Sequence, residues 1–290
     1  MIIVTGATGQ LGRQIVERLL VRVPADRIGV SVRDPQKVQA FAGQGVRVRH
    51  GSFDDAAGLA RAFEGATQVL IVSVDRMGEE AVRLHRTAID AAAAAGARRI
   101  LYTSHMGADP ASRFQACRDH AATEQALSES GVPWTALRNG FHASAAVQFL
   151  GHATASGSLV LPEDGPVSWT AHADLADAAA AVLADEGRFD GPTPPLTSAQ
   201  ALTFDDVAAI ATAATGRTIT RTTASDTLFR DQLLGNGVPA EAADQVLGIF
   251  EAARAGEFAT VDPTLAGLTG RGPTALSAVL GEHLTTDGGH

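Results

Sequence analysis

The sequence predicts an α/β fold with a doubly wound parallel sheet and a smaller, mostly helical carboxy-terminal lobe. Three observations support this prediction. Apolar strand-like runs alternate with helical periodicity through the first 140 residues, a glycine-rich segment follows the first run, and the alternation weakens afterwards. Strands that alternate with helices form right-handed βαβ units, which place parallel strands in the middle and helices on both faces.

The first half contains six expected strands, beginning with the β-branched run Ile-Ile-Val-Thr. They are expected at residues 2–5, 28–32, 46–49, 69–74, 99–103 and 134–137. Between them, apolar residues recur at helical spacing. Helices are therefore expected at residues 11–20, after Pro35, and at 56–63, 79–95 and 114–130. Gly96 and Gly131 stand where C-caps of the last two helices belong.

The second half has a weaker rhythm. Strand-like pieces are expected at 158–161, 167–170 and 218–222, with a helix at 174–185 and mostly helix from residue 203 onward. Residues 1–140 are therefore predicted to form one domain of the Rossmann type. Residues 141–290 are predicted to form mostly a second lobe, which partly interleaves with the sheet and walls a cleft beside it.

Composition narrows the class of protein. Of the 290 residues, 45% are hydrophobic and 19% charged, which excludes wholesale disorder. The net charge is −9 and no basic run occurs, so nucleic acid is not expected as a partner. The single Cys117 and the lack of a membrane-spanning apolar run or signal peptide favour a cytoplasmic protein. The composition leaves an oligomer possible.

A glycine loop with the spacing G-x-x-G-x-x-G lies between the first strand and the first helix. Gly6 can make the tight turn, Gly9 leaves room for a pyrophosphate, and Gly12 lets helix and strand pack closely. Free N–H groups and the positive end of the helix dipole favour bound phosphates there. A dinucleotide is therefore expected on this loop. Its expected binding residues are Gly6, Ala7, Thr8, Gly9, Gln10 and Leu11.

Arg33 follows the second strand. In dinucleotide-binding domains the residue at this position determines whether NAD or NADP is bound. A carboxylate at this position binds the ribose 2′-OH of NAD, whereas an arginine binds the 2′-phosphate of NADP. Arg33 therefore predicts NADP(H), with Lys37 as a possible second charge. The alternative is that Arg33 is a solvated surface residue and Asp34 binds the ribose, which would give NAD.

Three further strand ends supply the other expected walls of the site. Asp54 is placed to meet the adenine, although it could equally be the N-cap of the helix that follows. Ser73 and Val74 end the fourth strand beside the expected ribose and nicotinamide. Thr103 ends the fifth strand, near where hydride chemistry would occur.

Several motifs together resemble the NmrA-like branch of the atypical short-chain dehydrogenases/reductases. Within that branch the chain is similar to the bacterial type 2 NADPH:quinone oxidoreductases, and triphenylmethane-dye reductases look like close relatives. The motifs are TGATGQLG at 5–12, VRDP at 32–35, YTS at 102–104, HAATE at 120–124, LRNG at 137–140, DLA at 174–176 and LAGLTGR at 265–271.

The resemblance implies NADPH on the glycine loop and Arg33, with the nicotinamide end bordered by Ser73, Val74 and the loop Asn139, Gly140 and Phe141. The sequence lacks the Tyr-x-x-x-Lys pair of ordinary short-chain dehydrogenases, so alcohol oxidation by a tyrosine acid/base is not expected. His120 stands where related atypical members have a lysine.

His120 is the candidate catalytic residue, as a proton donor or a ligand of the cofactor ribose. The alternative is a structural histidine paired with Glu124 one helical turn later. His142, His152 and His172 lack paired metal-ligand spacing, so no metal site is expected.

Two functions remain open from the sequence. The first is an NADPH-dependent reductase that transfers hydride to a small, planar, electron-poor acceptor such as a quinone. The second is a non-catalytic NADP(H) sensor that regulates a partner. The acceptor pocket is expected among the carboxy-terminal helices, around Phe229, Leu233 and Phe250.

Overall fold

A seven-stranded parallel sheet forms the centre of the protein. The computed structural model describes residues 1–151 and 153–286. The strands of the sheet are β1 (Ile2–Thr5), β2 (Ile28–Val32), β3 (Arg47–His50), β4 (Gln68–Ile71), β5 (Arg99–His105), β6 (Trp134–Asn139) and β8 (Gly191–Pro192). Their order is β3-β2-β1-β4-β5-β6-β8, and every pair is parallel. This order confirms the predicted doubly wound fold.

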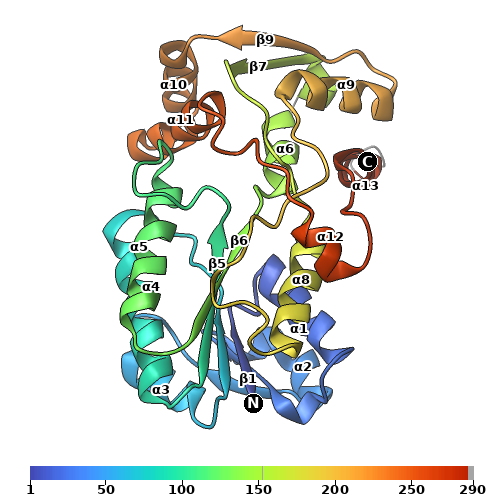
Figure 1. Ribbon diagram of the computed structural model, residues 1–290. Helices are drawn as coiled ribbons and strands as arrows, with labels where there is room; N and C mark the ends of the chain where they lie inside the picture. Colours follow the sequence, from blue (N-terminus) through green and yellow to red (C-terminus); the bar gives the residue numbers. More distant parts are fainter. Residues whose placement is uncertain (152, 287–290) are drawn as a thin grey trace.

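Helices cover both faces of the sheet (Figure 1). One face carries α3 (Ala56–Phe63), α4 (Gly78–Ala94) and α5 (Gln115–Glu129). The other carries α1 (Gln10–Leu20) and α8 (His172–Ala184), which pack against each other, and near them lies the short α2 (Gln39–Gly43). Two 3₁₀ turns, η1 (Ala25–Arg27) and η2 (Pro35–Val38), flank β2.

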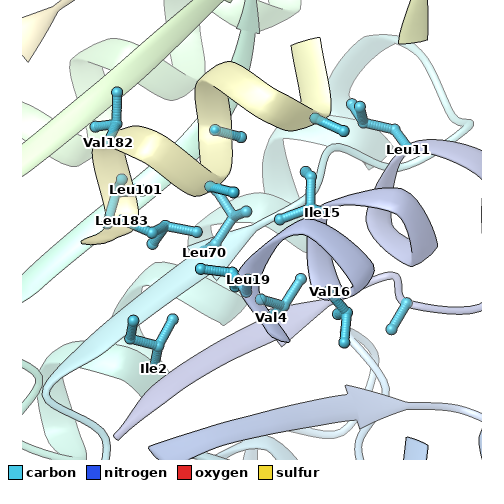
Figure 2. Packing of buried hydrophobic residues seen from close by; sticks show 14 of the residues in the cluster. Ile2, Val4, Leu11, Ile15, Val16, Leu19, Leu70, Leu101, Val182 and Leu183 are labelled. Atoms are coloured by element: carbon cyan, nitrogen blue, oxygen red, sulfur yellow. The ribbon is translucent and has the colours of Figure 1, made fainter. Parts of the chain in front are cut away.

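The core under α1 and α8 anchors the glycine loop. Val4 of β1, Ile15 and Leu19 of α1, and Leu183 of α8 are almost fully buried against one another (Figure 2). Burying an apolar side chain of this size stabilises a fold by about 1.5–3 kcal/mol. Since α8 comes from the second half of the chain, that half contributes directly to the core beneath the loop.

Most of the rest of the second half packs around a second hydrophobic core, at the top of Figure 1, to which Met106, Phe114 and Cys117 of the first half also contribute. A small parallel sheet pairs β7 (Ser158–Pro162) with β9 (Thr220–Ala224). The helices there are α6 (Ala143–Leu150), α7 (Ala153–Ser156), α9 (Phe204–Thr215), α10 (Asp226–Gly235), α11 (Ala240–Arg254) and α13 (Leu276–Thr286). The short α12 (Thr264–Thr269) packs instead against α8 in the first core. The division into two domains stays a prediction.

Two expected elements of the second half differ from the structure, and one short strand there was not expected. Residues 167–170 form isolated bridges to residues 202 and 142, because they lie against two separate segments instead of one strand. The strand expected at 218–222 lies at Thr220–Ala224. The unexpected strand is β8, in which two residues of the Pro-rich stretch pair with the backbone of β6. A strand of two residues is too short to be detected from hydrophobic periodicity.

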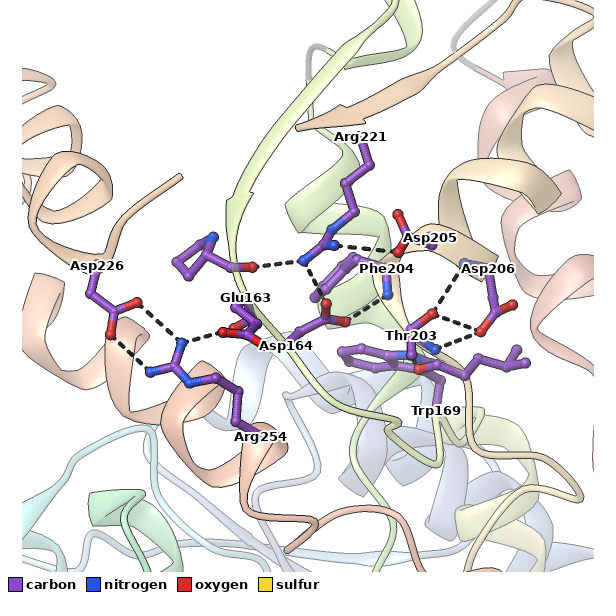
Figure 3. A network of polar contacts seen from close by, with 12 residues as sticks. Glu163, Asp164, Trp169, Thr203, Phe204, Asp205, Asp206, Arg221, Asp226 and Arg254 are labelled. Carbon is purple, nitrogen blue, oxygen red and sulfur yellow. Dashed lines mark hydrogen bonds and ion pairs between the residues drawn. The ribbon is translucent and has the colours of Figure 1, made fainter. Parts of the chain in front are cut away.

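Charged residues fix the connections in the carboxy-terminal lobe (Figure 3). Arg221 of β9 pairs with the buried Asp164, which also accepts a hydrogen bond from the Phe204 N–H at the start of α9. Breaking the buried Arg221–Asp164 pair would leave an uncompensated charge, so this pair holds β9 and α9 in one arrangement. Arg254 of α11 binds Asp226 of α10 through two guanidinium nitrogens, at 3.1 and 2.8 Å, and links these two helices at a partly exposed position.

Candidate functional site

The glycine loop has the backbone that a phosphate site requires. Gly6 has φ +64°, and a Cβ there would lie 3.1 Å from that of Val72. A Cβ on Gly12 would lie 2.3 Å from the Gly6 carbonyl oxygen, so only glycine permits this contact of helix and loop. Gly9 is the N-cap of α1, with no capping side chain and no acidic residue in the first turn. The first N–H groups of α1 are thus left for an anion.

A cavity of about 420 Å³ lies along the carboxyl ends of the strands. It contains most of the residues expected to bind the cofactor. These are Gly6, Thr8, Gly9, Gln10, Leu11, Arg33, Asp54, Ser73 and Val74. Several other lining residues were not expected from the sequence. These are Ser31, Val32, Gly51, Ser52, Phe53, Val72, Asp75, Arg76, Glu80, Leu84, His142 and His172. A cavity with a glycine loop at its centre fits a dinucleotide.

Arg33 marks one end of this cavity. Its side chain is exposed and has no hydrogen bond or ion pair to the rest of the described chain. The neighbouring Asp34 instead caps η2, where its carboxylate accepts from the Gln36 N–H at 3.1 Å. Asp34 also lies outside the cavity lining. This arrangement favours Arg33 over Asp34 as the residue that selects the cofactor. It therefore favours binding of a 2′-phosphate, as in NADP(H), over binding of a ribose hydroxyl, as in NAD. Ser31 adds a buried hydroxyl without a hydrogen-bond partner.

The sequence left two roles open for Asp54, contact with the adenine or capping of the next helix. In the structure the capping role belongs to Asp55. Asp55 is the N-cap of α3 and accepts from the Gly58 N–H at 2.9 Å. Asp54 lines the cavity and lies 3.4 Å from the Arg83 guanidinium. The capping alternative for Asp54 is therefore wrong.

Ser73 and Val74 are held by buried side chains beneath them. The Ser73 N–H donates to Thr103 Oγ1 at 2.8 Å, and the Val74 N–H donates to His85 Nε2 at 3.1 Å. Burial lowers the pKa of His85 to about 4, so this ring stays neutral and keeps its acceptor nitrogen at pH 7. The segment after β4 is thereby fixed against the cavity.

Four expected binding residues lie outside the cavity lining: Ala7, Asn139, Gly140 and Phe141. Gly140 meets a packing requirement, because a Cβ there would lie 2.2 Å from Thr170 Oγ1. Phe141 belongs to an aromatic cluster with Trp169 and Phe258. Contact of these residues with a cofactor stays a prediction.

His142 and His172 form the end of the cavity opposite Arg33. They extend from separate segments, which a backbone bridge between His142 and Thr170 brings together. Their ring centroids are 4.2 Å apart. Burial and the neighbouring His172 and His105 lower the pKa of His142 to about 3, and burial lowers that of His172 below 6.5. Both rings are thus neutral at pH 7.

His120 lies beneath the cavity and does not line it. Its Nδ1 is 2.7 Å from the hydroxyl of Tyr102, whose pKa is raised by complete burial. The hydroxyl therefore keeps its proton at neutral pH and forms a hydrogen bond with His120 Nδ1. Burial and the nearby histidines lower the pKa of His120 well below its ordinary value. The proton-donor role predicted for His120 remains untested by this geometry.

The expected His120–Glu124 pair does not form. Glu124 binds the Arg138 guanidinium at 2.7 Å and accepts from the Ser104 hydroxyl at 2.6 Å. A fully charged arginine outcompetes a neutral, desolvated imidazole for a carboxylate, so the pairing predicted from helical spacing is wrong.

The residues that the structure describes include no cluster of three or more potential metal ligands. His152 lies outside the described residues. Within residues 1–151 and 153–286, no helix is both long enough and apolar enough to cross a bilayer.

Comparison with known proteins identifies the family. The NmrA-like family matches residues 1–270. The chain belongs to the NmrA-like family. Among its NmrA-like relatives, quinone oxidoreductase 2 of Escherichia coli (strain K12) is 36% identical over 281 residues, which cover 96% of each chain.

Two solved structures resemble this NmrA-like chain closely. The E. coli NADPH-dependent quinone oxidoreductase complexed with NADPH superposes with a TM-score of 0.92, at 34% identity over 98% of this chain and 100% of the other. The Citrobacter sp. triphenylmethane reductase complexed with NADP(H) gives 0.89, at 32% identity over 97% and 99%. The predicted family resemblance is thus confirmed.

Proposed function

We propose that this protein is an NADPH-dependent reductase that transfers hydride to a small, planar, electron-poor acceptor of the quinone type. The observation that carries the proposal is the cavity that extends from an unpaired Arg33, past a glycine loop, to the partly buried His142 and His172. The relatives described above act on quinones and triphenylmethane dyes and bind NADPH, which supports the same chemistry here.

In this proposal each part of the cavity has a separate task. Arg33 binds the 2′-phosphate through charge-assisted hydrogen bonds, and the N–H groups from Gly9 to Leu11 bind the pyrophosphate. Ser73 and Val74 border the nicotinamide, whose position their hydrogen bonds to Thr103 and His85 keep fixed. When bound, NADPH supplies the hydride, while the protein orients the acceptor and excludes water.

Other parts of the proposal concern the context in the cell. The acceptor is a small molecule, and the buried, single Cys117 suits a reducing compartment. A cytoplasmic location, an oligomeric state and the absence of a nucleic-acid partner stay predictions.

Steady-state oxidation of NADPH in the presence of a simple benzoquinone tests the proposal. We expect quinone-dependent loss of NADPH absorbance by the wild-type protein, with NADPH preferred to NADH. NADPH binding without turnover on quinones or dyes would contradict the reductase and favour the regulatory sensor.

A further inference from the structure

His142 and His172 form a polar pair in the cavity that the proposed chemistry has not yet used. Both rings line the cavity, and their centroids are 4.2 Å apart. No hydrogen bond within the described chain involves either imidazole side chain. Polar groups that are partly buried in a pocket and have no protein partner are available to a ligand, because leaving them unpaired when the ligand covers them is costly.

The pair lies at the end of the cavity where the acceptor must bind. Along the sheet, the cavity passes from the ends of β3 and β2 to β1, then β4, and ends beyond β6 at the two histidines. If Arg33 binds the phosphate at the β2 end, the nicotinamide lies toward the other end. This step rests on the proposed function.

The protein holds the pair rigidly. The Ala143 N–H donates to the Thr170 carbonyl at 2.9 Å, and the Thr170 N–H donates to that of Phe141 at 2.7 Å. These bonds fix the segment that carries His142 against the residues just before His172, the first residue of α8. Preorganised donors contribute more than mobile ones, because they need no rearrangement during the reaction.

The charge state of the pair suits a hydrogen-bond donor. Burial lowers the pKa of both rings, so at pH 7 each carries one N–H and no charge. The titratable groups that act on His142, besides His172, are His105 and His120. The cavity lining also carries Asp54, Asp75, Arg76 and Glu80, and Arg33 at its opposite end. Asp174, on the same helix as His172, is occupied by Arg271 and Thr274.

We propose that the N–H of His172, whose ring packs against that of His142, donates a hydrogen bond to a carbonyl oxygen of the acceptor and stabilises the charge that develops there. The acceptor takes up a hydride from NADPH, that is, one proton together with two electrons, and its oxygen becomes anionic. A proton from solvent completes the hydroquinone, and NADP⁺ remains. His172 itself is neither oxidised nor reduced and keeps its own proton.

Two acceptors separate this role from other roles of the same residue. A benzoquinone develops negative charge on an oxygen when it receives hydride. A cationic triphenylmethane dye receives hydride at carbon, becomes neutral, and needs neither an oxyanion donor nor a proton. The ratio of the two rates in one protein sample is independent of the amount of folded protein.

The experiment compares wild type, His172→Leu, His172→Gln and His50→Gln, an exposed histidine outside the cavity lining, as the control. We expect His172→Leu to lower kcat/KM for the benzoquinone by about 10- to 100-fold, the usual loss for a hydrogen bond to a charged group. For the dye it should change by less than about threefold, and His172→Gln, which keeps an N–H, should recover most of the quinone activity. His50→Gln should match wild type with both acceptors.

Equal losses with both acceptors, or no loss with the benzoquinone, would overturn the role of His172 while leaving the reductase intact. A wild-type protein that oxidises NADPH with neither acceptor would overturn the proposed function itself, and with it this inference. Melting curves with NADPH accompany each variant and separate loss of fold from loss of the contact.

Discussion

At one end of the cavity Arg33 is exposed and has no protein partner, whereas at the other end His142 and His172 are partly buried and lie side by side. An exposed cation retains its charge and binds an anion, with part of the attraction screened by salt. A desolvated imidazole loses its charge and presents a neutral donor. The two ends of one cavity thus separate recognition of the cofactor from the place where the reaction is proposed to occur.

The glycine loop, which both ends share, gives the largest expected effect. Gly9→Val should abolish NADPH binding, because its side chain would occupy the space above the α1 N-terminus. The substitution should leave the fold intact, since a Cβ on Gly9 would meet only the Gly6 carbonyl oxygen, at 3.4 Å. The measurement is a thermal melt with and without NADPH. A normal upward shift of Tm in this variant would place the pyrophosphate elsewhere.

Lowering the pH should lower the free energy of unfolding because of the buried histidines. Arg33, at the other end of the cavity, should not contribute to this effect. Burial lowers the pKa of His85 and His105 to about 4 and that of His142 to about 3. Between about pH 6.5 and pH 4 the unfolded chain binds protons that the folded protein does not, so stability falls with falling pH. Each histidine contributes up to about 1.4 kcal/mol per pH unit, several kcal/mol in all between pH 7 and 5.

Urea unfolding at pH 7 and pH 5 measures this effect. In His85→Gln, a matched variant that lacks one of the three groups, the free energy of unfolding should depend less steeply on pH. A wild-type stability that is flat across this range would show that these histidines become protonated without unfolding.

Arg33→Ala should weaken NADPH binding and leave NADH binding nearly unchanged, because only the 2′-phosphate loses its partner. A charge-assisted hydrogen bond contributes roughly 1.5–3 kcal/mol, so the NADPH Kd should rise about 10- to more than 100-fold. Titration of both cofactors against the variant measures the difference. Lys37→Ala, which changes an exposed cation outside the cavity lining, should have a smaller effect. Equal losses of affinity for NADPH and NADH would contradict the role of Arg33 and favour Asp34 as the residue that binds the ribose.

His120→Ala should have the smallest effect on turnover, a loss of quinone reductase activity nearer tenfold than a thousandfold. His120 lies outside the cavity lining, and a positioned general acid would contribute about 10²–10⁴-fold. The buried Tyr102 hydroxyl would lose its 2.7 Å partner, so the free energy of unfolding should fall by about 1–3 kcal/mol. A kcat loss beyond a hundredfold with unchanged NADPH affinity would make His120 catalytic.

The same contrast governs what the sequence could predict. The Arg33 end was predictable, because its loop, helix and strand are contiguous and their geometry follows from glycine spacing and periodicity. The histidine end was not, since His142 and His172 are thirty positions apart in the sequence. Their contact depends on the bridge at Thr170, in a segment that the apolar pattern presented as a strand. Spacing also suggested the wrong partner for Glu124, which the distant Arg138 occupies.

A crystal structure of the protein with NADPH tests the central claim most directly. We expect the 2′-phosphate at the Arg33 guanidinium, the pyrophosphate on the N–H groups after Gly9, and the nicotinamide between Ser73 and the His142–His172 pair. A space for a planar acceptor should remain beside His172. A cofactor bound in the reverse direction, or a nicotinamide remote from the two histidines, would show that the two ends of the cavity do not have these roles.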